Sequence, residues 1–91
     1  MEFAAGPPNK WVVTLRSGAV LELAADSYNE ENGNAEFHIL ADATADEQEI
    51  LEIVSRGAGG RRVIVLVARI PMAEVGSIAG GWAWNDTGQD V

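Results

Sequence analysis

The sequence contains no cysteine and a single histidine, His38, among its 91 residues. It therefore has no disulfide framework, no thiolate metal ligand and no cysteine nucleophile, and one histidine does not make a multi-histidine metal centre. His38 shares a strand face with Glu36, but acid–base catalysis also needs a nucleophile and a cleft. A partly exposed histidine is the simpler interpretation, and neither a metal nor another cofactor is expected.

Long apolar runs are also absent, since none approaches the ~20 residues that a transmembrane helix requires. A chain of this length forms one domain and buries roughly 60–65% of its unfolded surface. Residues 1–9 lack the basic and apolar regions of a signal peptide. A cytoplasmic location with no membrane contact is therefore expected.

Basic residues are few, because six Lys and Arg stand against fourteen Asp and Glu, which gives an acidic protein of net charge −8. A general nucleic-acid-binding protein needs a basic surface that neutralises phosphates, so this composition weighs against one. Three of the six basic residues flank a glycine-rich loop, namely Arg56, Arg61 and Arg62. They are a candidate anion site, although the Walker spacing is absent and a solvated loop is the simpler interpretation.

What the sequence does contain is a series of short β-type segments separated by turn residues. Strands are expected at 10–15, 19–24, 35–40, 62–70 and 75–78, with hairpin turns at 16–18 and 29–34 and one helical turn at 71–74. This order is typical of a mainly β fold, a small antiparallel five- to six-stranded barrel or meander of the SH3 or Sm type. It would carry a short helical insertion around 44–54. An open antiparallel sheet with one helix packed across it is the alternative.

The insertion itself has two interpretations. Thr44 and Glu47 have the spacing of a capping box, which predicts the start of a helix. Several β-branched side chains follow, so the segment is either one helix or a helical turn and then a strand. We favour the second interpretation, with the turn at 44–49 and the strand at 50–55.

The segment 62–70 is apolar on both faces of the expected strand. Three valines at alternate positions face one way, and Ile64, Leu66 and Ala68 face the other. Such a strand is normally buried on both sides, whereas a small barrel has one interior. We therefore expect Ile64, Leu66 and Ala68 to contact a covering segment or another subunit.

The two ends differ in composition from the domain between them. We expect an N-terminal arm at 1–9, a single β domain at 10–78 and a C-terminal arm at 79–91. Trp82 and Trp84 in the second arm share one side of an extended segment. They are expected either to insert into another subunit or partner protein or to cap their own domain.

The segments WVVTLRSG, AEFHI and VARIPMAEVGSI resemble small proteins of unknown function that are common in actinobacteria and their phages. The similarity is sharpest at Ala68–Pro71 and in the short strand after it. It implies a small β-barrel or sheet with no known activity, and a place in the virion if the source is a phage. A weaker similarity of Asp26 and Asn29 to the RNA pocket of Sm proteins implies nucleic-acid binding.

Three classes of function follow from these observations. A non-enzymatic interaction or structural module that forms a homo-oligomer explains the strand that is apolar on both faces and the paired tryptophans. An Sm-like nucleic-acid-binding ring is the second class, and a small enzyme or ligand-sequestering protein with a site between subunits is the third. We favour the first, with the chain itself and a further protein as its partners.

Overall fold

The computed structural model describes residues 1–57 and 59–80. Its elements, in chain order, are β1 (Glu2–Phe3), β2 (Asn9–Leu15), β3 (Val20–Ala25), β4 (Ser27–Glu31), β5 (Asn34–Asp42), α1 (Ala45–Gln48), β6 (Ile53–Arg56), β7 (Arg62–Pro71), the 3₁₀ turn η1 (Met72–Glu74) and β8 (Val75–Gly80). The expected class, mainly β with a short helix and a helical turn before the last strand, is confirmed.

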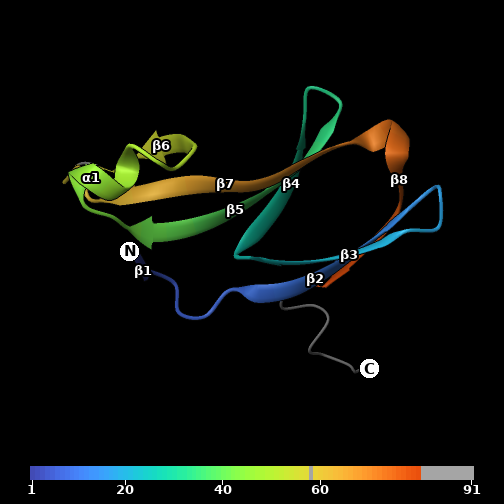
Figure 1. Cartoon of the computed structure of the whole chain (residues 1–91), viewed down its shortest axis with the longest axis horizontal. Coiled ribbons are helices and arrows are strands. Elements are labelled where there is room, and N and C mark those ends of the chain that lie inside the picture. Colours follow the sequence, from blue (N-terminus) through green and yellow to red (C-terminus); the bar gives the residue numbers. More distant parts are fainter. Residues whose placement is uncertain (58, 81–91) are drawn as a thin grey trace.

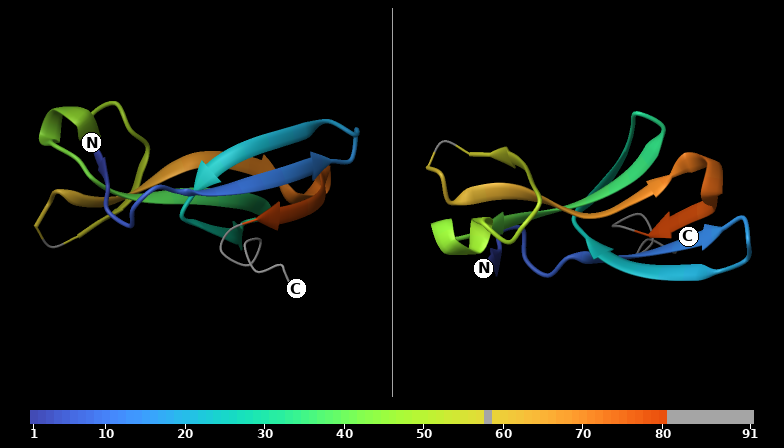
Figure 2. Two further views of the ribbon diagram at one scale, coloured as in Figure 1. Left: turned by 90° about the horizontal axis from the view of Figure 1, so that it is seen from below. Right: turned by 45° about the horizontal axis from the view of Figure 1, so that its top comes forward.

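All strand pairs are antiparallel and form two sheets (Figure 1). The larger sheet has the order β1-β5-β7-β6, with β4 also paired to β5, and the smaller has the order β3-β2-β8. Within the described residues β7 and β8 do not pair with each other, so the expected barrel is not closed. Figure 2 shows that β5 and β7 continue past the smaller sheet to the end that carries α1 and β6.

The β4–β5 hairpin turns within two residues. Asn32 and Gly33 both have positive φ, 51° and 79°, which is the backbone pattern of a type I′ turn. This turn matches the twist of the flanking strands, so β4 continues to Glu31 and β5 begins at Asn34. The hairpin turn expected around Gly33 is therefore confirmed, whereas its expected bounds of 29–34 are wrong because the turn is shorter.

The β2–β3 hairpin depends on Gly18, whose φ of 97° lies in the left-handed region. Its N–H donates to the carbonyl oxygen of Leu15 at 2.9 Å. A Cβ at this position would meet no described atom within 4 Å, so any penalty for a side chain comes from the backbone conformation. This confirms the glycine expected at positive φ.

We expect Gly18→Val to lower the free energy of unfolding by about 1–3 kcal/mol, because a β-branched residue resists positive φ. Gly18→Asn is the matched control, since asparagine tolerates this conformation better, and its loss should be smaller. Urea denaturation of the three proteins measures both effects. Equal losses for valine and asparagine would contradict this assignment.

The insertion between β5 and β7 is a helical turn followed by a strand, as favoured from the sequence. The Thr44 hydroxyl accepts from the Glu47 N–H at 3.2 Å, and the Glu47 carboxylate accepts from the Thr44 N–H at 2.9 Å. This capping box starts α1, which ends at Gln48. The strand β6 then begins at Ile53, three residues later than expected, and pairs with the first half of β7.

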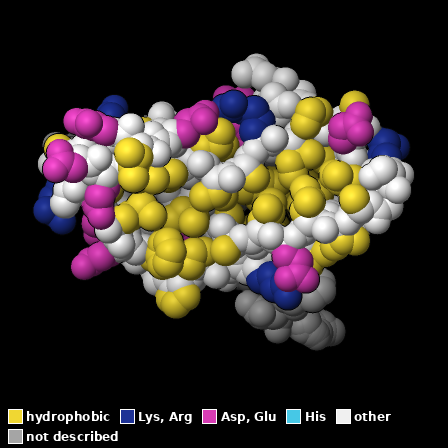
Figure 3. Space-filling view, viewed as in Figure 1, with side chains coloured by type: hydrophobic (Ala, Val, Ile, Leu, Met, Phe, Trp, Pro, Cys, Tyr) yellow, Lys and Arg dark blue, Asp and Glu magenta, His cyan; other side chains and the backbone are white. Residues whose placement is uncertain are grey.

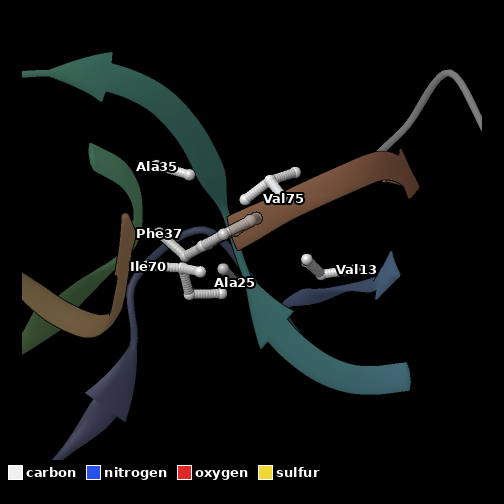
Figure 4. Packing of buried hydrophobic residues seen from close by; sticks show 6 residues of the cluster. All are labelled: Val13, Ala25, Ala35, Phe37, Ile70 and Val75. Carbon is white, nitrogen blue, oxygen red and sulfur yellow. The ribbon is translucent and has the colours of Figure 1, made fainter. Parts of the chain in front are cut away.

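The core lies on one face of the larger sheet and has two parts. Between the two sheets are Val13, Ala25, Ala35, Phe37, Ile70 and Val75 (Figure 4). Phe37 is fully buried and stacks on Tyr28, with ring centroids 5.1 Å apart, and contacts Trp11 edge-on at 5.6 Å. Beyond the smaller sheet, a second cluster consists of Ile39, Ala41, Ala43, Val63 and Val65, packed by Leu51 and Ile53.

A β-bulge in β7 changes which of its residues face this core. Phe37 and His38 on β5 pair with Ala68 and Leu66 on β7, so Val67 is the extra residue. An extra residue reverses the in–out alternation of the strand beyond it. Odd-numbered residues of β7 therefore face the core before Val67, and even-numbered residues face it after Val67.

One predicted face is corrected by this bulge. Val63 and Val65 face the core before it, whereas Ala68 packs against the core cluster after it. Strict alternation placed Ala68 on the same face as Ile64 and Leu66, which is wrong because the alternation is interrupted at Val67.

Both ends of the described chain belong to the sheets. Glu2 and Phe3 pair with the end of β5, so the segment expected as an N-terminal arm contributes a short strand. At the other end Gly80 pairs with Trp11, which extends β8 beyond the expected domain end at residue 78. Trp82 and Trp84 lie outside the described residues.

Candidate protein-interaction surface

The larger sheet has a second face, opposite to the core, that is built from cross-strand pairs of β5 and β7. We call it the outer face, and its paired residues are Glu36 and Arg69, His38 and Leu66, Leu40 and Ile64, and Asp42 and Arg62. Charged pairs occupy its two ends, and between them lie Leu40, Ile64 and Leu66 together with the imidazole of His38. The arrangement follows from the alternation of β5, whose other residues face the core.

The apolar centre of the outer face consists of Leu40, Ile64 and Leu66, which we call the outer patch. These residues belong to neither hydrophobic cluster of the described chain. Ile64 is 36% exposed, and Leu40 and Leu66 are half-buried. The sequence expectation that Ile64 and Leu66 lie away from the core agrees with this placement.

Exposed hydrophobic side chains also occur elsewhere on the molecule. The large ones in the described residues are Met1, Phe3, Val20, Ile50, Val54, Ile64 and Val67. Figure 3 shows hydrophobic side chains across both halves of the viewed face, with charged side chains mainly around its border. Contiguous exposed apolar surface on a small domain is typical of an interaction site. Among the exposed residues, Val54 and Val67 lie on β6 and β7, the strands that flank or form the outer patch.

A hollow of about 140 Å³ opens beside the outer patch. Its lining residues are Leu40, Ser55, Arg56, Gly57, Arg62, Val63 and Ile64. It brings together two of the three arginines predicted for an anion site and one residue predicted for an interface. Arg61 is outside the residues that line it.

The arginines of this hollow already have protein partners. Arg62 donates from Nε to Asp42 at 2.7 Å, and Arg56 donates from Nε to the Gln48 side-chain oxygen at 3.0 Å. In the loop, the Gly57 N–H donates to the Arg62 carbonyl, so it does not point freely toward an anion. The hollow therefore has a basic rim that is fixed by neighbouring polar groups.

The Arg62 side chain, by hydrogen bonding, holds the pKa of Asp42 below its usual value of 3.8. The stabilisation from this pair is thus present above the usual pKa and is lost as the pH falls through the lower, folded-state pKa. We expect Arg62→Gln to raise the pKa of Asp42 toward its usual value. Carboxyl chemical shifts followed by NMR during an acid titration measure it, and an unchanged pKa would contradict the pairing.

His38 is enclosed rather than partly exposed, which corrects the sequence interpretation. It is 7% exposed, and within residues 1–57 and 59–80 its Nε2 has no hydrogen-bond partner. The nearest acidic oxygen belongs to Glu36, 3.7 Å away, and Glu36 also accepts from Arg69 at 3.0 Å. Arg69 reaches Glu52 as well, at 3.3 Å.

This network was not predicted, because it joins residues whose proximity depends on strand register. Glu36 and Arg69 are cross-strand partners on β5 and β7. Glu52 directly precedes β6, which pairs with β7 on its other side. Neither hollow described for the chain includes His38. In the described part of the chain, no three His, Asp or Glu side chains gather in a way that would hold a metal ion.

Asp26 and Asn29, the two residues similar to an RNA pocket, make contacts within the sheets. The Asp26 carboxylate accepts from the Leu40 N–H at 2.8 Å, and its own N–H donates to the His38 carbonyl at 2.8 Å. These bonds fix the bend between β3 and β4. Asn29 donates to Glu31 at 3.4 Å on the same strand. A structural role thus accounts for Asp26.

A second hollow, of about 360 Å³, lies on the smaller sheet, lined by Pro8, Lys10, Glu22, Leu23 and Ala24. Lys10 and Glu22 form an ion pair across it at 3.2 Å, with both side chains largely exposed. Exposed pairs of this kind contribute little to stability or binding. The outer patch is therefore the stronger candidate site.

Comparison with protein-family models, curated proteins and solved structures finds no match to this chain. Among the described residues, no helix has the length and apolar character needed to cross a membrane.

Proposed function

We propose that this chain is a non-enzymatic protein-interaction module that associates with copies of itself through the outer patch. The observation that carries the proposal is that Leu40, Ile64 and Leu66 lie together on the face opposite to the core and join neither hydrophobic cluster. Apolar side chains of this size are usually buried, and burial of each contributes ~1.5–3 kcal/mol. A second copy of the chain is the partner that we propose for this surface.

A symmetric contact makes efficient use of such a patch. In a two-fold interface each residue contributes twice, once from each copy. A stable interface buries about 1,200–2,000 Å² in total, which is more than three side chains provide. Val54 and Val67, which are 53% and 42% exposed, are further apolar side chains on β6 and β7.

The surroundings of the patch favour specific association over general stickiness. Charged pairs border it on both sides, Asp42 with Arg62 at one end and Glu36 with Arg69 at the other. Interfaces commonly have an apolar centre and a polar rim, and rim charges select the orientation of the partner. The single histidine is enclosed and borders neither hollow, so the described residues offer more support for binding than for catalysis.

We expect Ile64→Glu to convert the oligomer to a monomer of 9.7 kDa, because it places a charge at the centre of the contact. Val20→Glu is the matched control, since Val20 is 58% exposed on β3 of the other sheet. Sedimentation equilibrium at micromolar concentration measures the mass of each variant. Circular dichroism checks that both retain the fold.

Two results would contradict the proposal. One is an Ile64→Glu protein with the same mass as the unmodified chain. The other is loss of the oligomer in Val20→Glu and not in Ile64→Glu, which would place the contact on the smaller sheet.

A further inference from the structure

The outer patch has a complementary sequence within the chain itself. Residues 81–91, GWAWNDTGQDV, contain two tryptophans and two aspartates and no lysine or arginine. The outer patch is apolar, and at one end of it lies Arg62, whose guanidinium is paired with Asp42. An apolar segment that carries an aspartate therefore matches an apolar surface with an arginine at its edge.

The spacing of the two sequences also matches. Leu66, Ile64 and Arg62 are at alternate positions on β7, on the side of the sheet away from the core. An extended segment likewise places Trp82, Trp84 and Asp86 on one side, because side chains alternate along a strand. Each series therefore has two large apolar side chains followed by a charged one, and the charges of Arg62 and Asp86 are opposite in sign.

The position of β8 favours a contact between different copies. β8 ends at Gly80, paired with Trp11 in the smaller sheet. The core cluster around Phe37 lies between the two sheets and includes Val75 of β8, so the outer face of the larger sheet is on the side away from β8. Eleven extended residues span at most ~36–40 Å, and the Cα extents of the molecule are 39 × 29 × 18 Å. Docking on the same copy would require the segment to pass around the domain, whereas a neighbouring copy can present its patch directly.

We propose that residues 81–91 of one copy dock on the outer patch of another, in the direction antiparallel to β7. Trp82 and Trp84 cover Leu66 and Ile64, and Asp86 lies toward Arg62. This inference rests on the proposed self-association and names the segment that occupies the patch. Tryptophan rings bury 150–250 Å² or so each and are frequent anchors of interfaces, so two of them suit a short arm.

The absence of native cysteine allows a direct test with the full-length chain. One variant carries Ser55→Cys, in the hollow, and the other carries Asp86→Cys, on the same side of the extended segment as Trp82 and Trp84. After mixing and mild oxidation, intact-mass spectrometry should find the disulfide-linked heterodimer, because the two chains differ in mass. A Val20→Cys variant mixed with Asp86→Cys is the control, and it should link far less. Adding Ile64→Glu to the Ser55→Cys chain should abolish the link.

A second variant separates this inference from the proposed function. Trp82→Ala with Trp84→Ala should yield a monomer that keeps the melting temperature of the domain. This protein could instead stay oligomeric, with no Ser55→Cys link, while Ile64→Glu is still monomeric. That result would show that the patch binds a second patch, and it would overturn the assignment of residues 81–91 without overturning the proposed self-association. If a chain with both cysteines links within itself, docking is on the same copy, which also overturns it. If the unmodified chain is a monomer, both proposals fail.

Discussion

Replacing Phe37 with alanine should lower the free energy of unfolding by about 3–5 kcal/mol. The ring is fully buried and contacts both Trp11 and Tyr28, at the place where the two sheets meet. Aromatic pairs of this kind contribute ~0.5–1.5 kcal/mol beyond the area that they bury. A domain of this size has little stability to spare, so much of the variant should be unfolded in water at 25 °C. Urea denaturation followed by circular dichroism measures the loss.

Phe3→Ala is the matched control, because it removes the same ring from a site that is 49% exposed on β1. Its expected loss is about 1 kcal/mol. Equal losses at the two positions would show that the core is not centred on Phe37.

The second large effect is expected at Gly80, the last residue of β8. Its φ is 135°, and a Cβ there would collide with the Lys10 carbonyl oxygen and lie 2.7 Å from the Trp11 Cα. Both contacts are with backbone atoms, which cannot move aside as a flexible side chain can. Gly80→Val should therefore break the end of the β2–β8 pairing and cost about 3 kcal/mol or more.

Gly59→Val is the control for this substitution. Gly59 is exposed, and a Cβ there would meet no described atom within 4 Å. Its change should stay within about 0.5 kcal/mol. Thermal unfolding of the two variants measures the loss of stability. Amide hydrogen exchange at Trp11 and Val12 shows whether the pairing between β2 and β8 is disrupted. Retention of slow exchange at these amides in Gly80→Val would contradict the close packing of β8 on β2.

Most of the strand positions could be predicted because their signals are local. Alternating apolar residues identify β2 and the β-branched run identifies β7, while Thr44 and Glu47 mark the start of α1 by their spacing alone. The Asn32–Gly33 turn also has a local signal, a dipeptide typical of type I′ turns. The polar residues on both sides of it are equally typical of a loop, so the sequence predicts a loop at positions where β4 continues in the structure.

The features that escaped prediction depend on pairing between distant strands. The bulge at Val67 is defined by the register of β7 against β5, so no pattern within β7 alone reveals that Ala68 turns toward the core. The burial of His38 and its proximity to Glu36 and Arg69 have the same origin. For the candidate site, Ile64 and Leu66 were predictable from the apolar alternation of their strand, whereas Leu40 joined them only through its pairing with Ile64.

The claim that the outer patch binds a second copy can be tested most directly on the unmodified chain. Sedimentation equilibrium over a range of micromolar concentrations gives its mass without any substitution. Self-association through Leu40, Ile64 and Leu66 predicts a weight-average mass that is above 9.7 kDa and that decreases toward this value on dilution. A constant mass of 9.7 kDa at every concentration would contradict it.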